Sequence, residues 1–247
     1  MLSLDPIIVV LLYASLAAVA AALGVVPHAV AGRLPLPMLG WANALASGLM
    51  LGVAYSLFAL QFSAGVLDVA SGALVGVAFV WLVHAGTGTT ELDLNRLDEL
   101  EPAYGYQVVL VNVLHSAYEG IAIGAAMLVS LPFGISMVGA LAVHNIPEAM
   151  ILTAVVTSRG VSHRQAAALA VAANLSQVLL AVVTFAVVGV LPALLPWVAG
   201  FAAGTLIYLV FVELLPESYR EAGHTSIALV TLIAMGIVVA LAAGGPS

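Results

Sequence analysis

The sequence contains no cysteine and no lysine, and only 7% of its residues carry a charge. Without cysteine, neither a disulfide framework nor a thiolate metal site can form. Average soluble domains have roughly a quarter charged residues, whereas this chain of 247 residues is 64% hydrophobic. The composition therefore excludes an ordinary soluble domain and predicts an integral membrane protein that lies in a lipid bilayer. A net charge of -7 argues against nucleic acid as a partner.

Long apolar stretches dominate what is present. A helix needs about 20 mostly apolar residues to cross the hydrocarbon layer, and the sequence offers eight such stretches. We therefore expect an all-α fold of eight transmembrane helices in one domain over residues 1–247, with the first helix retained rather than cleaved as a signal peptide. The expected spans are near 6–26, 40–60, 65–85, 107–130, 133–156, 165–190, 196–214 and 226–243.

The basic residues indicate an orientation in the membrane. With eight spans, all five fall in loops on the same side of the bilayer: Arg33, Arg96, Arg159, Arg164 and Arg220. Cytoplasmic loops carry an excess of positive charge, so we expect these loops in the cytoplasm and both termini outside, in the cell (plasma) membrane. The stretch at about 87–106 is then a cytoplasmic acidic loop. We interpret it as a solvated linker, with the collection of cations near an exit as the alternative.

A faint repeat relates the second and seventh expected helices. The stretches GLMLGVAYSLFALQ, from Gly48, and GFAAGTLIYLVFVE, from Gly200, each have two glycines four residues apart and end on a polar residue. Because these helices would cross the membrane in opposite directions, a true repeat would relate helices 1–3 to helices 6–8 by inversion. Small residues four apart also allow helices to pack closely without any repeat, and both interpretations stay open.

Two motifs place ionisable residues deep inside apolar stretches. HSAYEG starts at His115 and HNIPEAM starts at His144, and in each a glutamate follows four residues later, at Glu119 and Glu148. Residues i and i+4 lie on the same face of a helix. The turn between the two helices lies near 131–133, so equal distances from it place His115 level with Glu148 and Glu119 level with His144. We therefore expect two crossed histidine–glutamate contacts.

These four side chains predict a metal site. Ionisable groups inside a bilayer are costly and normally pair with each other or line a polar cavity. Two imidazoles and two carboxylates within tetrahedral reach suit Zn²⁺ and also accept Fe²⁺ or Mn²⁺. A static core of two ion pairs is the alternative, but it would not explain Pro147, which removes a backbone bond and frees the carbonyl group of Val143 for an ion or water.

Helices 6 and 7 contribute further polar residues. In AANLSQ, Asn174, Ser176 and Gln177 fall near the middle of helix 6, where they either line a cavity or link helices by hydrogen bonds. In ELLPES, Glu213 and Glu217 fall near the cytoplasmic end of helix 7, where they either relay a released cation or contact headgroup water. Three further histidines fall at or beyond helix ends, where we expect solvated imidazoles: His28, His84 and His163.

These motifs resemble those of the ZIP (Zrt/Irt-like) family of divalent metal transporters, in its GufA-like prokaryotic branch. The fourth and fifth helices of that family typically carry HNxxEG-like and HNxPEG-like motifs, here HSAYEG and HNIPEAM, and ELLPES and GLMLGVAYSL fit the same pattern. The resemblance implies eight spans, external termini, a variable loop after helix 3 and uptake of a divalent metal into the cytoplasm. Zn²⁺ is the expected cargo, with Fe²⁺, Mn²⁺ and Cd²⁺ as further candidates.

The resemblance also implies a set of ligands. The primary metal site would consist of the four residues of the two motifs: His115, Glu119, His144 and Glu148. A second site, completed by helix 6, would use residues next to them: Ser116, Asn145 and Gln177. Because Ser116 stands where the family often has Asn, and Gln177 where it often has Glu, we expect one strong site and a weak second ion or only a lined cavity.

The predicted mechanism is alternating access. The hairpin of helices 4 and 5 would move relative to helices 2 and 7, and the ion would leave past Glu213 and Glu217. Metal binding should displace protons from histidine and glutamate, so uptake should depend on pH between about 5 and 8. The alternatives are a membrane-embedded zinc hydrolase, which the absence of HExxH and the four protein ligands disfavour, and a metal receptor that does not transport. Small residues on several helices would allow a homodimer.

Overall fold

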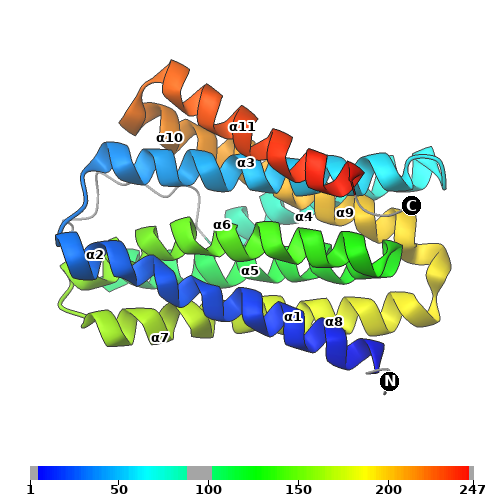
Figure 1. Cartoon of the computed structure of the whole chain (residues 1–247), viewed down its shortest axis with the longest axis horizontal. Coiled ribbons are helices and arrows are strands. Elements are labelled where there is room, and N and C mark those ends of the chain that lie inside the picture. The colour runs from blue at the N-terminus through cyan, green and yellow to red at the C-terminus, as the bar shows by residue number, and fades with distance from the viewer. Residues whose placement is uncertain (1–4, 88–101, 245–247) are drawn as a thin grey trace.

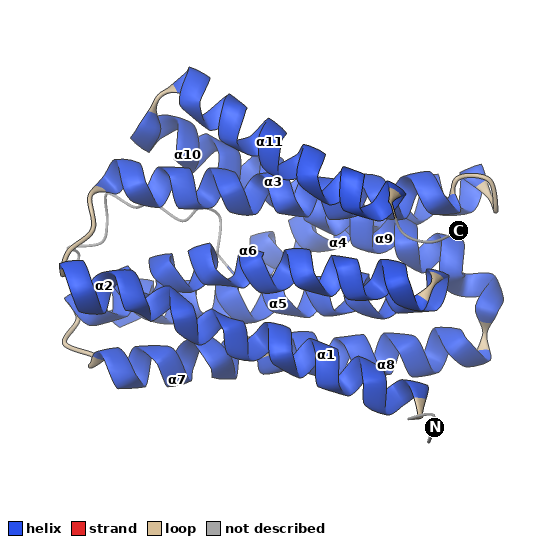
Figure 2. Cartoon of the chain, viewed as in Figure 1, coloured by secondary structure: helices blue, strands red, loops and turns tan. Residues whose placement is uncertain are grey.

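The computed structural model describes residues 5–87 and 102–244, and within these residues every regular element is a helix (Figure 2). Eight helical segments of the described chain are long and apolar enough to cross a membrane. The predicted eight-span, all-α fold is therefore confirmed. Most of the predicted acidic loop, together with Arg96, lies outside the described residues.

Some spans are single helices and others are divided. Grouped by span, the elements are α1 (Pro6–Ala20), η1 (Ala21–Val25) and α2 (Val26–Ala31); α3 (Leu36–Gln61); α4 (Val66–Thr87); α5 (Pro102–Val129); α6 (Leu131–Ser158); α7 (His163–Ala173) and α8 (Leu175–Val190); η3 (Pro192–Leu194), α9 (Leu195–Leu209), η4 (Val210–Leu214) and α10 (Leu215–Ala222); and α11 (His224–Ala243). Helix α6 continues through Pro147, so the backbone bond that this proline removes does not break the helix. The seventh span differs, because the π-helical turn η4 interrupts its α-helix immediately before Leu215 and Pro216.

The helices form two groups (Figure 1). In the first group, α4 packs along α9 and α3 packs against α9, α10 and α11. In the second group, α5 packs against α6 and α8, and the first span packs against α6 and α8. The groups meet mainly where α3 lies on α6 and α5 lies on α9. Both termini lie at one end of the molecule, and the α2–α3, α6–α7 and α10–α11 connections lie at the other (Figure 1).

The described arginines share one end of the bundle. Each lies in or next to a connection opposite the termini: Arg33, Arg159, Arg164 and Arg220. The structure thus separates the arginines from the termini in the way that the sequence predicts. Which of these ends faces the cytoplasm remains a prediction of the positive-inside rule.

Glycine allows the helices of the first group to approach closely. A Cβ atom added at Gly72 of α4 would lie 2.1 Å from the carbonyl oxygen of Trp197, and one added at Gly200 of α9 would lie 2.1 Å from that of Val69. A distance this short means that the two backbones touch, and any side chain would push them apart. The contact is reciprocal, because each helix supplies glycines to it.

The α3–α11 contact uses the matching glycines of the other repeated stretch. A Cβ atom added at Gly48 of α3 would lie 2.3 Å from the carbonyl oxygen of Thr231 on α11. An inverted repeat would make the second span equivalent to the seventh and the third equivalent to the eighth. Helix α3 then corresponds to α9 and α11 corresponds to α4, so the α3–α11 contact is the counterpart of the α9–α4 contact. The small residues therefore serve close packing, and the two contacts are also the pair that an inverted repeat predicts.

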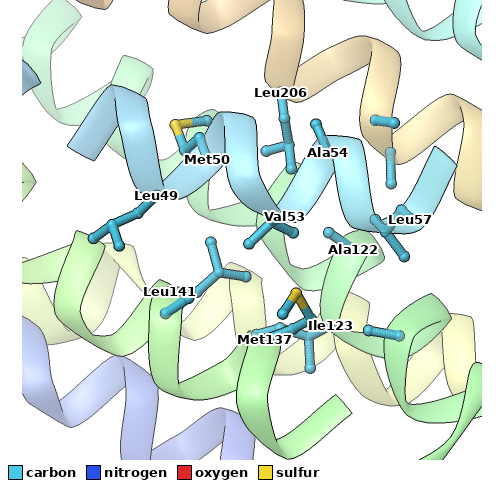
Figure 3. Packing of buried hydrophobic residues seen from close by; sticks show 14 of the residues in the cluster. Leu49, Met50, Val53, Ala54, Leu57, Ala122, Ile123, Met137, Leu141 and Leu206 are labelled. Carbon is cyan, nitrogen blue, oxygen red and sulfur yellow. The ribbon is translucent and has the colours of Figure 1, made fainter. Parts of the chain in front are cut away.

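An apolar core lies where the two groups meet. Val53 and Leu57 of α3 pack with Ile123 of α5 and with Met137 and Leu141 of α6 (Figure 3). All five side chains are fully buried. Ile123 lies one helical turn after Glu119 on α5, and Leu141 lies about one turn before His144 on α6. Both are therefore nearer to the α5–α6 connection than the motifs are, so this core borders the polar motifs on the side of the termini.

The glycine contact between α4 and α9 should be necessary for stability. We expect Gly200→Ala to lower the free energy of unfolding by about 1–3 kcal/mol, because the added methyl group overlaps the backbone of Val69. The matched control is Gly236→Ala, since Gly236 is also helical but has no atom within 4 Å of its added Cβ; this variant should be neutral or more stable by about 0.5–1 kcal/mol. Thermal unfolding in detergent measures both effects. Equal stability of the two variants would contradict the inferred backbone contact.

Candidate metal centre

The two motifs meet in the interior between α5 and α6. His115 and Glu119 come from α5, His144 and Glu148 come from α6, and all four are buried. His144 Nε2 lies 2.7 Å from Glu119 Oε1, and His115 Nδ1 lies 3.5 Å from Glu148 Oε1. These are the two crossed contacts predicted from the equal distances to the hairpin turn. The helical spacing and the short connection therefore suffice to bring the four groups together.

A backbone carbonyl orients the ring of His144. His144 Nδ1 lies 3.2 Å from the carbonyl oxygen of Ala46 on α3, and a carbonyl can only accept, so Nδ1–H donates. In a neutral ring, Nε2 then carries the lone pair and faces the two glutamates. Metal-binding histidines generally use their second nitrogen in this way, which holds the ring and its tautomer in place.

The contact between His144 and Glu119 must contain a proton when no metal ion is bound. At 2.7 Å, an imidazole nitrogen and a carboxylate oxygen would both present lone pairs unless hydrogen lay between them. Apart from contacts to histidine, the carboxylate oxygens of Glu119 and Glu148 have no hydrogen-bond partner in the described chain. Buried carboxylates without donors are costly. A divalent cation that replaces the proton would satisfy both glutamates at once.

The spacing of these atoms suits a small divalent ion. Glu119, His144 and Glu148 each offer a ligand atom within 4.8 Å of the others. Ligands at about 2.1 Å from a tetrahedral Zn²⁺ lie about 3.4 Å apart. His144 Nε2 is 2.7 Å from Glu119 and 4.0 Å from Glu148, so shifts of less than about 1 Å would reach this geometry. The group can therefore hold a metal ion with small side-chain rotations.

A second group of possible ligands lies beside the first. It consists of His84, His115 and Glu213, all buried. Glu213 Oε2 lies 3.1 Å from His115 Nε2, and Glu213 Oε1 lies 3.0 Å from His84 Nδ1. Glu213 belongs to the π-helical turn η4, and π turns inside α-helical spans occur frequently at functional sites. His115 touches both groups, because its other nitrogen faces Glu148.

Together the two groups form one continuous row of alternating acids and imidazoles. The order of the contacts is Glu119, His144, Glu148, His115, Glu213 and His84, with neighbouring atoms between 2.7 and 4.0 Å apart. The row begins at the middle of α5 and α6 and ends three residues before the end of α4 at Thr87. Helix α4 starts at the end that carries the termini and runs toward the end with the arginine-bearing connections (Figure 1).

The expectation for His84 is wrong. The sequence suggested a solvated imidazole at a helix end, but His84 is only 3% exposed and its ring lies against that of Tyr208. The reason is that His84 lies on the face of α4 that packs along the seventh span, where it contacts Tyr208 and Glu213. A signal was present, since the buried face of α4 repeats at Gly72, Gly76, Val80 and His84, which is helical spacing.

His28 also differs from the expectation of a solvated imidazole. It is 5% exposed, because the first span continues through α2 and packs against α6. For Glu213 and Glu217 the sequence left two alternatives open, and their burial disfavours contact with headgroup water. Glu217 instead pairs with Arg220 of the same helix. His163 is exposed, as expected.

The predicted second site is held together by hydrogen bonds between its own polar groups and neighbouring helices. Asn145 Nδ2 donates to Gln177 Oε1 and to the carbonyl oxygen of Ala17, both at 3.0 Å. Ser116 Oγ donates to Asn174 Oδ1 at 3.2 Å. These bonds join α6 to the first and sixth spans and α5 to the sixth span. The arrangement gives Asn145 and Gln177 a structural role, and their use as weak ligands stays a prediction.

Comparison with known proteins adds an independent finding. The family model described as "ZIP Zinc transporter" matches residues 95–243. A protein of Arabidopsis thaliana named "Putative zinc transporter At3g08650" is 32% identical over 209 residues, which cover 82% of this chain and 33% of that protein. The chain therefore spans about a third of the length of this curated relative. The family match includes both motifs and the π-helical turn.

Removal of His144 should abolish tight metal binding. We expect His144→Ala to weaken the affinity for Zn²⁺ by about 100-fold or more, because even the loss of a residue that only orients a ligand weakens metal affinity by about 10–100-fold. Isothermal titration calorimetry on the detergent-purified protein would measure this. His224→Ala is the matched control, because His224 is an exposed histidine and should leave the affinity unchanged. If both variants bound Zn²⁺ as the wild type does, the group around His144 would not be the metal site.

Proposed function

The chain belongs to the ZIP zinc transporter family, and from this premise we propose that it carries a divalent transition-metal ion, most readily Zn²⁺, across the bilayer into the cytoplasm. The observation that carries this proposal is the buried row of six alternating carboxylates and imidazoles. Such groups are energetically costly inside a membrane, and where they occur they usually mark an ion pathway or a proton relay. Family membership also sets aside the zinc hydrolase considered from the sequence.

In this proposal the ion first binds at Glu119, His144 and Glu148. It replaces the proton between His144 and Glu119, so binding releases protons and is favoured at higher pH. Two carboxylates neutralise the charge of a divalent ion, which reduces the cost of holding it in the interior. Nitrogen and oxygen ligands suit Zn²⁺, Fe²⁺, Mn²⁺ and Cd²⁺, whereas the absence of cysteine disfavours Cu⁺.

The ion then passes to the second group through His115. This side chain contacts Glu148 with one nitrogen and Glu213 with the other, so a ligand of the first group is already next to a ligand of the second. His84 completes the second group. His115 on α5 and Glu148 on α6 each lie one helical turn farther from the α5–α6 connection than Glu119 and His144 do. The proposed route therefore leads toward the arginine-bearing end, which the positive-inside rule places in the cytoplasm. Beyond it lies Glu217, which extends the acidic route.

The opposite direction is closed by the apolar core. Ile123, Met137 and Leu141 fill the space between the motifs and the end that carries the termini (Figure 3). Fully buried, closely packed side chains leave no path for a hydrated ion. The conformation described here therefore corresponds to a state that is closed toward the outside, and loading from that side requires a rearrangement of this core.

We place that rearrangement at the boundary between the two helix groups. The contact of His144 with Ala46 joins α6 to α3, and the contact of His115 with Glu213 joins α5 to the seventh span. Movement of the α5–α6 group relative to the α3–α9 group would break both contacts and expose the first ligand group to the other side. This is alternating access, with both termini outside and the protein in the cell membrane. A homodimer stays a prediction from the small-residue helix faces.

Uptake into proteoliposomes tests transport. We expect the wild-type protein to give saturable uptake of radiolabelled Zn²⁺, and the double variant His144→Ala, Glu148→Ala to give no more than protein-free liposomes, since two of the three first ligands are gone. Size-exclusion chromatography and the thermal unfolding midpoint verify that the variant is folded. Zinc binding without flux in the wild-type protein would instead identify a receptor.

A second experiment tests the route through His84. We expect His84→Ala to lower the uptake rate about tenfold, as for the loss of a well-placed ligand, while the Zn²⁺ affinity of the first group changes little. The affinity is measured by calorimetry and the rate by uptake, with His224→Ala as the control. A parallel fall in both quantities would assign His84 to the binding site itself, and an unchanged rate would remove it from the route.

A further inference from the structure

A second polar feature lies away from the metal centre, at the arginine-bearing end of the bundle. A pocket of about 380 Å³ is enclosed by α2, the connection after it, the end of α6 and the start of α7. This volume is within the range of roughly 300–1,000 Å³ that small-molecule pockets occupy. The lining includes two imidazoles, a guanidinium group and two hydroxyl groups: His28, Arg33, Thr157, Ser158 and His163. No carboxylate is among the described residues that line it.

His28 is the group that most needs a partner. It lines the pocket although only 5% of the residue is exposed. Its Nδ1 is buried without a hydrogen-bond partner in the described residues. A buried ring nitrogen without a partner is uncommon in native proteins and destabilising. His28 therefore brings an imidazole with an unsatisfied nitrogen to the wall of the pocket.

The charges around the pocket favour an anion. Arg33 brings a positive charge to the pocket, and the two imidazoles can each donate a hydrogen bond from a ring N–H. A divalent cation would be repelled by Arg33, with no carboxylate among the described lining residues to offset it. An anion between these groups would instead accept hydrogen bonds from all three, and the bond from Arg33 would be charge-assisted.

The backbone holds the basic groups over the pocket. Gly32 ends α2 with φ 71°, which is the left-handed region that glycine adopts most easily. The chain therefore turns sharply and places Arg33 at the pocket rather than in line with α2. The hydroxyl groups of Thr157 and Ser158 donate to the carbonyl oxygens of Thr153 and Val155, so their oxygens remain able to accept from a ligand hydroxyl group.

An apolar pocket lies next to the basic one. It has a volume of about 450 Å³, and Ser158 lines both pockets. Its walls are mostly apolar, from residues such as Val109, Val156 and Leu169, with Arg159 among them. A basic pocket beside an apolar one is the combination that an anionic phospholipid requires, because it has a charged headgroup and acyl chains.

We propose that the pocket around His28 and His163 binds a phosphate group at the membrane surface, carried by an anionic phospholipid or by free phosphate. Basic pockets between transmembrane helices are known to take phospholipid headgroups. Arg33 lies on the connection between the two helix groups, whereas His28 and His163 belong to one of them. A phosphate bound to all three therefore ties the connection to α6 and α7, so the site couples the bilayer to the boundary at which the groups meet.

The test compares two probes on the purified protein. Retention of phosphatidylglycerol is measured by native mass spectrometry, with phosphatidylcholine as the neutral lipid, and inorganic phosphate is titrated by calorimetry. The test variant is the double change Arg33→Gln, His163→Ala, which alters two exposed residues and is therefore compatible with folding. Arg164→Gln is the control, because Arg164 is exposed on the same helix and does not line the pocket.

We expect the wild-type protein and the control to retain phosphatidylglycerol in preference to phosphatidylcholine. The double variant should bind it about tenfold more weakly, since the charge-assisted hydrogen bond from Arg33 and the hydrogen bond from the His163 imidazole are both lost. If the double change weakens the binding of inorganic phosphate about tenfold but leaves the binding of phosphatidylglycerol unchanged, the phosphate comes from solution and the anion site stands. Equal binding of both probes to the double variant and the control would overturn the proposal. Zinc binding that the double variant alone loses would also overturn it and make the pocket a metal site.

Discussion

A buried carboxylate without a hydrogen-bond donor is the constraint on which the rest of this structure depends. Glu119 is 0% exposed, and among the described residues the imidazole of His144 is the one polar group in direct contact with its carboxylate. In a low-dielectric interior this pair must hold either a proton or a metal ion. The ring of His144 is in turn held by the carbonyl group of Ala46. The position of α3 against α6 thus decides where a cation is accepted.

The glycine contacts supply the rigidity that this arrangement needs. Because α4 touches α9 and α3 touches α11 through bare backbone, each pair behaves as a firm unit against which α5 and α6 are placed. The proposed metal ligands do not all lie within one unit. His115 and His144 come from the α5–α6 group, while Glu213 and His84 come from the other. In the proposed mechanism, occupancy of the site and the relative position of the groups are therefore linked, since the contacts that would coordinate an ion are also contacts across the boundary.

Much of the fold and of the centre could be predicted from local spacing. Apolar runs gave the eight spans, and the i, i+4 spacing with a short hairpin gave the crossed contacts of His115 with Glu148 and of Glu119 with His144. The partnership of His84 with Glu213 could not be predicted in this way. It depends on the alignment of α4 with the seventh span, two segments more than 100 residues apart, and on a π-helical turn. His84 could have been recognised as buried from the helical repeat of Gly72, Gly76 and Val80, although its partner could not.

A row of shared ligands also has a kinetic consequence. A single tight site would hold a divalent ion too firmly to release it, whereas conduction requires binding that is favourable but divided among several positions. Here His115 faces Glu148 on one side and Glu213 on the other. On the proposed route, an ion that moves from the first group to the second could therefore form a new bond before it loses the last old one. Because each contact in the row is at most 4.0 Å long, no step of this route would require a bare ion to cross apolar space. The free-energy cost of dehydration would then be met once, when the ion enters the first group, and recovered at the arginine-bearing end.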